Sequence, residues 1–215
     1  MAQKNNTVAI FDRDNTLLNS EMKLKSDVTE AMHRLGVNIS QEQIMGDWYK
    51  LVKSKGLNKK DFDREFNKRK SWEESIKDGE VKMFSKAMDC LEILYENNIL
   101  MGLITRSIPE YTQIKIEQFN LEKYFQGNIA ITPVKSTNGK IKEAESLVKK
   151  LNPTKIEKIY FIGDKKEDVE IAKPIGREYK LSSKGIYIKR KESQPFLRGY
   201  TSIKSLDELP QIILS

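Results

Sequence analysis

Five short apolar runs are the feature that most constrains the fold of this 215-residue chain. None of them alternates clearly between apolar and polar residues, which is typical of strands buried on both faces of a sheet. Helical patterns separate the later runs, as in βαβ units. We therefore predict an α/β fold in which a parallel sheet lies between helices. The expected strands cover residues 7–11, 100–105, 129–134, 158–162 and 185–188.

The interval between the first two strands is about ninety residues long and has no convincing strand pattern. It is too long for one crossover helix, so it predicts an inserted helical module. Asp27 with Glu30 resembles an N-terminal capping box that starts a helix. Ser40 with Gln43 and Asn58 with Asp61 show the same pattern. A further helix is expected from residue 85. We expect a core domain of residues 1–18 and 81–215, with the module at 19–80.

Two single residues exclude several kinds of chemistry. Cys90 is the only cysteine and His33 the only histidine, so thiolate metal clusters and a Ser-His-Asp triad are excluded. Acid–base work must then come from carboxylates, lysines or tyrosines. Cys90 lies in an apolar helical stripe and is expected to be buried, whereas His33 is expected at the surface. The sequence has no apolar run of about 18 residues and no apolar signal-peptide core, which favours the cytoplasm over a membrane.

The positive charge is concentrated in the second half of the chain. The net charge is +7, and residues 135–204 hold 18 Lys and Arg residues against 9 Asp and Glu. Such an excess favours anionic ligands. An ordinary solvated, lysine-rich surface explains most of it equally well, and we prefer that interpretation for most of these residues.

Acidic residues follow the expected strands at the points where ligands bind to open parallel sheets. Asp12 and Asp14 follow the first strand. Thr105 and Arg106 lie at the end of the second, and Asp164 and Asp168 follow the fourth. Carboxylates held together need a cation, and oxygen ligands favour a hard one, Mg²⁺ foremost. An aspartate can also serve as a covalent nucleophile toward phosphorus, while a second one handles protons.

These residues, in this order, resemble the haloacid dehalogenase superfamily. Residues 11–17, FDRDNTL, are similar to its first motif, Thr105 to its second, and residues 163–168, GDKKED, to its fourth. The resemblance implies a Rossmann-like core with an inserted helical cap, as in phosphoglycolate-phosphatase-like members. It also implies a phosphatase rather than a dehalogenase, because dehalogenases of the superfamily lack the second aspartate, here Asp14.

The resemblance implies a role for each motif residue. Asp12 would be nucleophile and Mg²⁺ ligand, and Asp14 would be general acid and base, with its backbone carbonyl on Mg²⁺. Thr105 would bind the phosphoryl group, and Asp164 and Asp168 would complete the metal site. Asn15 and Arg106 are further candidates for phosphate binding. Asn15 stands where glycine is common, and Asn tolerates unusual backbone angles better than most residues.

The third motif is a lysine that neutralises phosphate and nucleophile. Lys140 is our first choice, because it precedes a helical pattern at residues 143–150, with Ile141 in place of the family's usual proline. Lys142 and Lys135 remain alternatives.

The predicted function is Mg²⁺-dependent hydrolysis of a small phosphate monoester through an aspartyl-phosphate. Two other functions stay open: a phosphatase for nucleic-acid ends, suggested by the basic second half, and a non-catalytic binding protein with this fold. The expected partner is a small phosphorylated metabolite, with no membrane, and the expected state is a monomer or homodimer. Aromatic residues of the insert are expected mainly in its own core, namely Trp48, Tyr49, Phe62, Phe66 and Trp72.

Overall fold

The computed structural model describes residues 6–44, 48–132, 140–190, 194 and 196–215. The chain divides into two compact units, one made of Met1–Asn19 with Met83–Ser215 and the other of Ser20–Lys82. The sequence prediction places the division elsewhere, between residues 18 and 19 and between residues 80 and 81, and it stays a prediction. Each unit is described by itself below.

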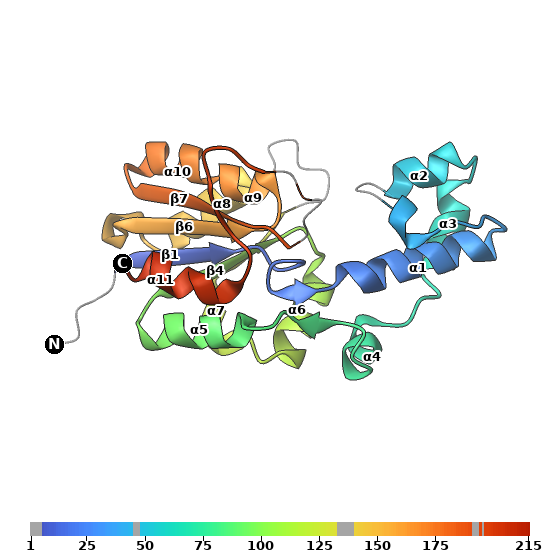
Figure 1. Ribbon diagram of the computed structural model, residues 1–215, viewed down its shortest axis with the longest axis horizontal. Coiled ribbons are helices and arrows are strands. Elements are labelled where there is room, and N and C mark those ends of the chain that lie inside the picture. The colour runs from blue at the N-terminus through green and yellow to red at the C-terminus, as the bar shows by residue number, and fades with distance from the viewer. Residues whose placement is uncertain (1–5, 45–47, 133–139, 191–193, 195) are drawn as a thin grey trace. The chain divides into compact units, whose positions relative to one another are not determined.

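The larger unit contains a six-stranded parallel sheet with strand order β5-β4-β1-β6-β7-β8, which confirms the predicted fold class (Figure 1). Phe11 in β1 pairs with Leu103 in β4 and with Ile162 in β6. The residues that follow these pairs therefore emerge at one edge of the sheet. The strands are β1 (Thr7–Phe11), β4 (Leu100–Thr105), β5 (Ile129–Ile131), β6 (Lys158–Gly163), β7 (Ser182–Ile188) and β8 (Thr201–Ile203).

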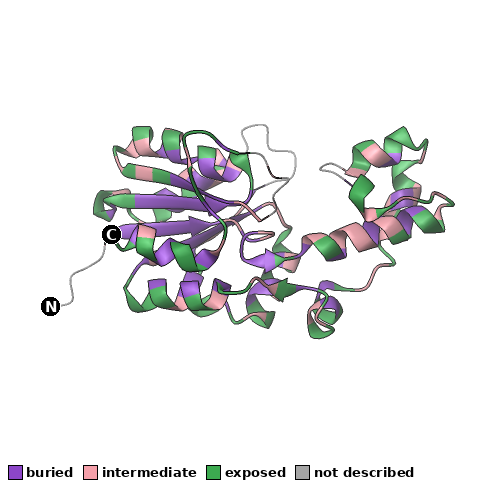
Figure 2. Ribbon diagram, in the orientation of Figure 1, coloured by how far each residue is buried: buried purple, intermediate pink, exposed green. Residues whose placement is uncertain are grey.

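Both faces of the sheet are buried, as the apolar runs predict. Alternate residues of β1 enter two different apolar clusters: Ala9 and Phe11 lie in one, Val8 and Ile10 in the other. The central strands are accordingly buried along most of their length (Figure 2). Helices cover each face. The first cluster includes residues of α5 (Ala87–Glu96), α7 (Glu122–Phe125) and α11 (Leu209–Ile213), and the second those of α8 (Ile141–Lys150) and α10 (Ala172–Tyr179).

Three sheet predictions need correction. The strand expected at 185–188 begins earlier, because residues 182–184 form the start of β7: their backbone pairs with β6 although their side chains are polar. Strand β8 was not predicted at all, since only Ile203 of its three residues is buried. Strand β5 ends at Ile131, and Thr132 lies outside it; the rest of the expected strand, 133–134, lies outside the described residues.

The smaller unit is helical and has its own apolar core. Its helices are α1 (Glu21–Arg34), the short 3₁₀ helix η1 (Gln41–Gln43), α2 (Trp48–Ser54), α3 (Lys59–Phe66) and α4 (Trp72–Lys77). Phe62 is fully buried at the centre, and the ring of Phe66 stacks on it at 5.5 Å and on Trp48 at 6.3 Å. The aromatic side chains therefore serve largely as core, although Tyr49 is 37% exposed.

The helix starts predicted in the insert are right in two cases and wrong in one. Ser40 with Gln43 forms the expected capping box, and Asn58 accepts a hydrogen bond from Lys60 N at 2.7 Å. Asp27, in contrast, lies inside α1 rather than at its start. Its carboxylate is buried and pairs with Lys23 Nζ, one turn earlier, at 2.9 Å. The two-residue strands β2 (Leu18–Asn19) and β3 (Lys82–Met83) also lie where no strand was expected.

Three further boundaries differ from the predicted ones. A helix start that the sequence did not predict lies at Ser71, which forms a capping box with Glu74 and begins α4. The helix expected from residue 85 begins at Ala87, and the one expected at 143–150 begins at Ile141.

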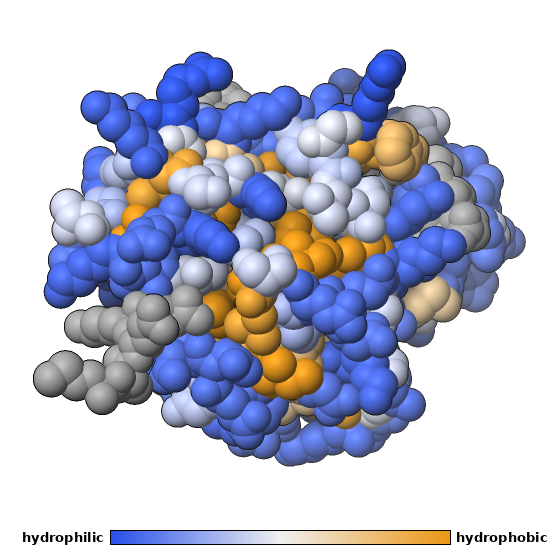
Figure 3. Space-filling model, turned by 60° about the vertical axis from the view of Figure 1, so that its left-hand side comes forward, coloured by the Kyte–Doolittle hydropathy of each residue, from blue (hydrophilic) through white to orange (hydrophobic). Residues whose placement is uncertain are grey.

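None of the helices in the described ranges has the length and apolarity needed to cross a bilayer. The face seen in Figure 3 is mainly hydrophilic.

Cys90 is buried in the first apolar cluster, as its sequence position predicts, and His33 is exposed. Burial raises the pKa of the Cys90 thiol to about 12. Because the thiolate is the reactive form, Cys90 is expected to resist Ellman's reagent in the native protein at pH 8 and to react at once in guanidinium chloride. Rapid labelling of the native protein, at the rate seen for the unfolded chain, would contradict this burial.

Candidate active site

Asp12 lies directly after β1, in a turn whose backbone is tightly hydrogen-bonded. Its amide donates to Ile162 O at 2.8 Å, which continues the pairing with β6 for one more residue. The amides of Leu17 and Leu18 both donate to Arg13 O, at 2.8 and 3.0 Å. Asn15 adopts φ 64°, in the left-handed region. An unusual backbone angle is expected here, because Asn15 stands at a position where glycine is common. The left-handed conformation lets the chain fold back after Asp14.

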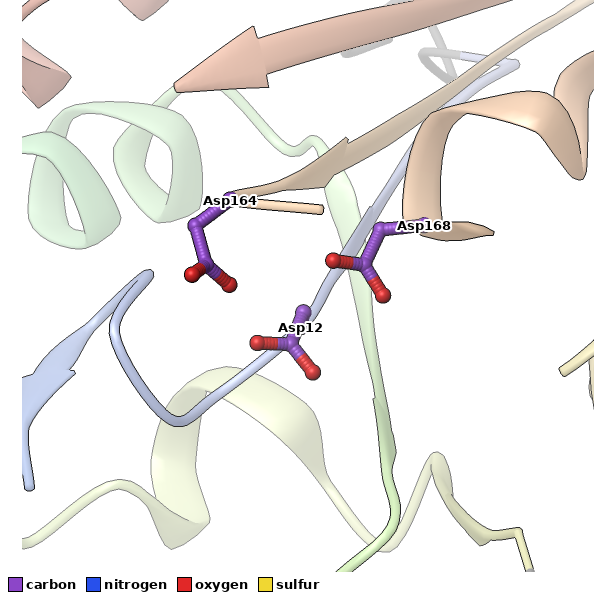
Figure 4. Close-up of side chains that lie close together, drawn as sticks. All are labelled: Asp12, Asp164 and Asp168. Carbon is purple, nitrogen blue, oxygen red and sulfur yellow. The ribbon is translucent and has the colours of Figure 1, made fainter. Parts of the chain in front are cut away.

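Three carboxylates converge at this edge of the sheet. Asp12 follows β1, Asp164 follows β6, and Asp168 lies in the short helix α9 (Lys166–Glu170) (Figure 4). One carboxylate oxygen from each lies within 4.8 Å of the others. Gly163 makes this approach possible, because a Cβ at that position would lie 2.3 Å from Asp168 Cβ. Any larger residue at 163 would push Asp168 away from the cluster.

Lys140 binds two of these three aspartates. Its Nζ donates to Asp12 Oδ1 and, at 2.7 Å, to Asp168 Oδ1. The side chain is buried, and it precedes α8. Burial by itself lowers the pKa of Lys140, but the charges of Asp12 and Asp168 outweigh it and hold the pKa above its usual range. Of the alternative lysines, Lys142 is exposed and Lys135 lies outside the described residues.

The acid cluster has the properties of a cation site. Burial is the main cause that raises the pKa of Asp164 to about 8 and that of Asp12 to about 6, and the negative charge of Asp168 adds to both shifts. Asp164 Oδ1 is buried and has no hydrogen-bond partner among the described residues. A buried oxygen without a donor is costly unless a cation binds it. Carboxylate oxygens alone suit a hard divalent cation such as Mg²⁺, so the residues present fit one.

Asp14 is not part of this group of three. Its two carboxylate oxygens bind two cationic side chains instead. Lys115 Nζ donates to Oδ1 at 2.8 Å, while Arg13 donates to Oδ2 from Nη2 at 2.6 Å and from Nε at 3.2 Å. Asp14 itself remains 31% exposed at its side chain. The metal contact that the sequence analysis assigns to Asp14, through its backbone carbonyl, stays a prediction.

Thr105 and Arg106, at the end of β4, have different surroundings. Thr105 is buried, and its Oγ1 accepts a hydrogen bond from Ser107 N at 3.2 Å. Arg106 Nη2 donates to Glu167 Oε2 at 2.6 Å, which joins the loop after β4 to helix α9. The predicted phosphate contact of Arg106 therefore competes with an existing ion pair. Asn15, the other candidate for phosphate binding, has a buried Oδ1 with no hydrogen-bond partner in the described part of the chain.

Sequence reasoning missed three residues of this region. Lys115 lies in α6 (Pro109–Gln118), where it is buried with Thr112 and Ile116 on one helix face. A lysine on the buried stripe of a helix is the signal that could have found it. Arg190 follows β7 and donates to the backbone carbonyls of Asn15 and Thr16. Thr16 in turn donates its hydroxyl proton to Asp12 Oδ2 at 3.2 Å.

Comparison with known proteins adds the family. The family model described as "Haloacid dehalogenase-like hydrolase" matches residues 9–179. Since this span includes most of the chain and the ends of β1, β4 and β6, the chain belongs to the haloacid dehalogenase-like hydrolase family, as its motifs suggest. A search of curated proteins finds no match.

Solved structures with the same fold extend over nearly the whole chain. A haloacid dehalogenase-like family protein from Streptococcus pneumoniae is 20% identical, with a TM-score of 0.69 over 96% of this chain and 99% of that one. A HAD phosphatase from Thermococcus onnurineus is also 20% identical, with a TM-score of 0.66 over 96% and 97%. A predicted phosphoglycolate phosphatase from Haemophilus somnus is 14% identical, with a TM-score of 0.68 over 99% of both chains. At such identities the likeness concerns the fold.

Proposed function

We propose that this hydrolase is a phosphatase that transfers the phosphoryl group of a small monoester to Asp12 and then to water. The observation that carries the proposal is the convergence of Asp12, Asp164 and Asp168 around Lys140 at the carboxyl edge of the sheet. The phosphatases among proteins of the same fold support it. The presence of Asp14 favours phosphoryl transfer over carbon–halogen hydrolysis.

In the first step an oxygen of Asp12 attacks phosphorus, so that a new P–O bond forms as the ester P–O bond breaks. Asp14 gives its proton to the departing oxygen. In the second step Asp14 takes a proton from water, whose oxygen attacks phosphorus and releases inorganic phosphate from Asp12. Lys140 keeps a positive charge beside Asp12 throughout, and Thr105 is proposed to bind a phosphoryl oxygen through its hydroxyl.

Asp12 and Asp164, with Asp168 in support, would hold Mg²⁺. When bound, the ion supplies positive charge that offsets the repulsion between phosphate and the acidic residues.

The inserted unit, Ser20–Lys82, is proposed to act as a cap that selects the substrate. A small metabolite as substrate, a cytoplasmic location and a monomeric or homodimeric state stay predictions. In the residues that the structure describes, no contact favours nucleic-acid ends or a purely binding role.

Removal of divalent cations tests the proposal. Thorough chelation with EDTA is expected to stop phosphate release from p-nitrophenyl phosphate, and Mg²⁺ is expected to restore it. Asp164→Asn should raise the Mg²⁺ concentration needed for half-maximal activity by about tenfold or more, because a metal ligand loses its charge. Asp89→Asn, on the exposed surface of α5, is the matched control and should change nothing. Undiminished turnover after chelation would reject a metal-dependent phosphatase.

A further inference from the structure

Asp14 must present its carboxyl group to a leaving oxygen, yet the sequence alone gives no reason for its orientation. In the structure that orientation is set from two separate elements. Arg13 precedes Asp14 in the chain and is fully buried, while Lys115 comes from α6, 101 residues further along. Each cation binds a different oxygen of the same carboxylate. Rotation of the carboxyl group would break both contacts at once.

The burial of Lys115 is expensive for the fold. Its side chain is 2% exposed, and moving an ammonium group out of water costs several kcal/mol before any pairing. A leucine or methionine at the same position would fill the buried stripe of α6 beside Thr112 and Ile116 without this cost. The charge is therefore better explained by its contact with Asp14 than by packing.

We propose that Lys115, together with Arg13, is a positioning residue for Asp14 in leaving-group protonation. This inference rests on the proposed phosphatase function and adds a residue that acts through Asp14 rather than on the substrate. As the ester P–O bond breaks, the proton of Asp14 moves to the leaving oxygen and Asp14 becomes a carboxylate. The two buried cations hold that carboxylate in place by hydrogen bonds that strengthen with its charge. The same fixed carboxylate then accepts a proton from the attacking water.

The dependence of the rate on the leaving group tests this role. Phenyl phosphate and p-nitrophenyl phosphate have similar shapes, but phenolate is the poorer leaving group and needs the proton more. kcat/KM reports on events up to the first irreversible step, which is phosphoryl transfer to Asp12. Lys115→Met is expected to lower kcat/KM for phenyl phosphate by about tenfold or more, and for p-nitrophenyl phosphate by less than about threefold. Lys149→Met, an exposed lysine of α8, is expected to match the wild type for both substrates.

A double mutant separates positioning from a general structural effect. If Lys115 acts through Asp14, adding Lys115→Met to an Asp14→Asn variant should cause no further loss for phenyl phosphate. Lys115→Gln, which keeps a hydrogen-bond donor, should show the same substrate difference to a smaller degree and serves if the methionine variant does not fold. Equal losses for both substrates, or a further loss in the Asp14→Asn background, would overturn the proposal. A wild-type protein that hydrolyses neither ester would instead reject the phosphatase function itself.

Discussion

Asp12→Asn is expected to abolish phosphate release from p-nitrophenyl phosphate, with a loss in kcat of at least about a thousandfold. The amide oxygen of asparagine is a poor nucleophile. The substitution also removes the negative charge of the Asp12 carboxylate, which attracts Lys140 and a divalent cation. The fold should persist, because Asn has nearly the same shape and the backbone amide of residue 12 keeps its bond to Ile162 O. Circular dichroism and steady-state kinetics measure both effects.

The matched control for this variant is Asp89→Asn. Asp89 is exposed on α5 and pairs only with nearby Lys86 in the described structure, so its change should leave kcat within about twofold of the wild type. Near-normal turnover by Asp12→Asn, with Asp89→Asn also normal, would show that Asp12 is not the nucleophile.

Lys140→Met is expected to cause the second largest loss, about a hundredfold or more in kcat/KM. The buried Nζ is the charge that Asp12 and Asp168 share, and without it the two carboxylates repel one another and the approaching phosphate. Breaking such a buried pair typically costs about 3–5 kcal/mol of stability, so the midpoint of denaturant unfolding of the metal-free protein should also fall. Kinetics and urea titration test the two parts of this prediction.

Lys142→Met distinguishes this role from a general effect of lysine at the start of α8. Lys142 is exposed two residues further along and should tolerate the same change in both measurements. The pair also decides among the lysines that sequence reasoning left open. If Lys142→Met were the damaging change and Lys140→Met harmless, Lys140 would have no catalytic role, although it lies beside Asp12.

Much of the sheet and its acidic edge follows from the sequence because the signal is local. The residues of β1 and β6 are apolar on both faces, and Asp12 and Asp164 come directly after these strands, so their approach needs only the parallel arrangement. Strand β8 and the first half of β7 were not predicted, because their signal is not local. Their backbone pairing is decided by neighbouring strands, while their polar side chains carry no strand pattern.

The electrostatic partners of the site were harder to predict because they depend on long-range contacts. Lys115 reaches Asp14 across 101 residues, and Arg190 reaches the carbonyls of the turn after β1 from the other end of the chain. Asp27 shows the converse error. Its spacing from Glu30 fits a capping box, but a partner one turn earlier, Lys23, stabilises it inside a helix. Local spacing does not reveal which of several cations a carboxylate binds.

Chemical trapping of the intermediate tests the central claim most directly. The protein is mixed with p-nitrophenyl phosphate and Mg²⁺ and quenched during turnover. Borohydride then reduces any acyl phosphate to an alcohol. Trypsin releases residues 5–13, NNTVAIFDR, a peptide whose only side-chain carboxylate is Asp12. The account predicts that this peptide carries homoserine at position 12, and only when substrate is present. Active turnover with an unmodified peptide, or with the reduced residue at another aspartate, would contradict it.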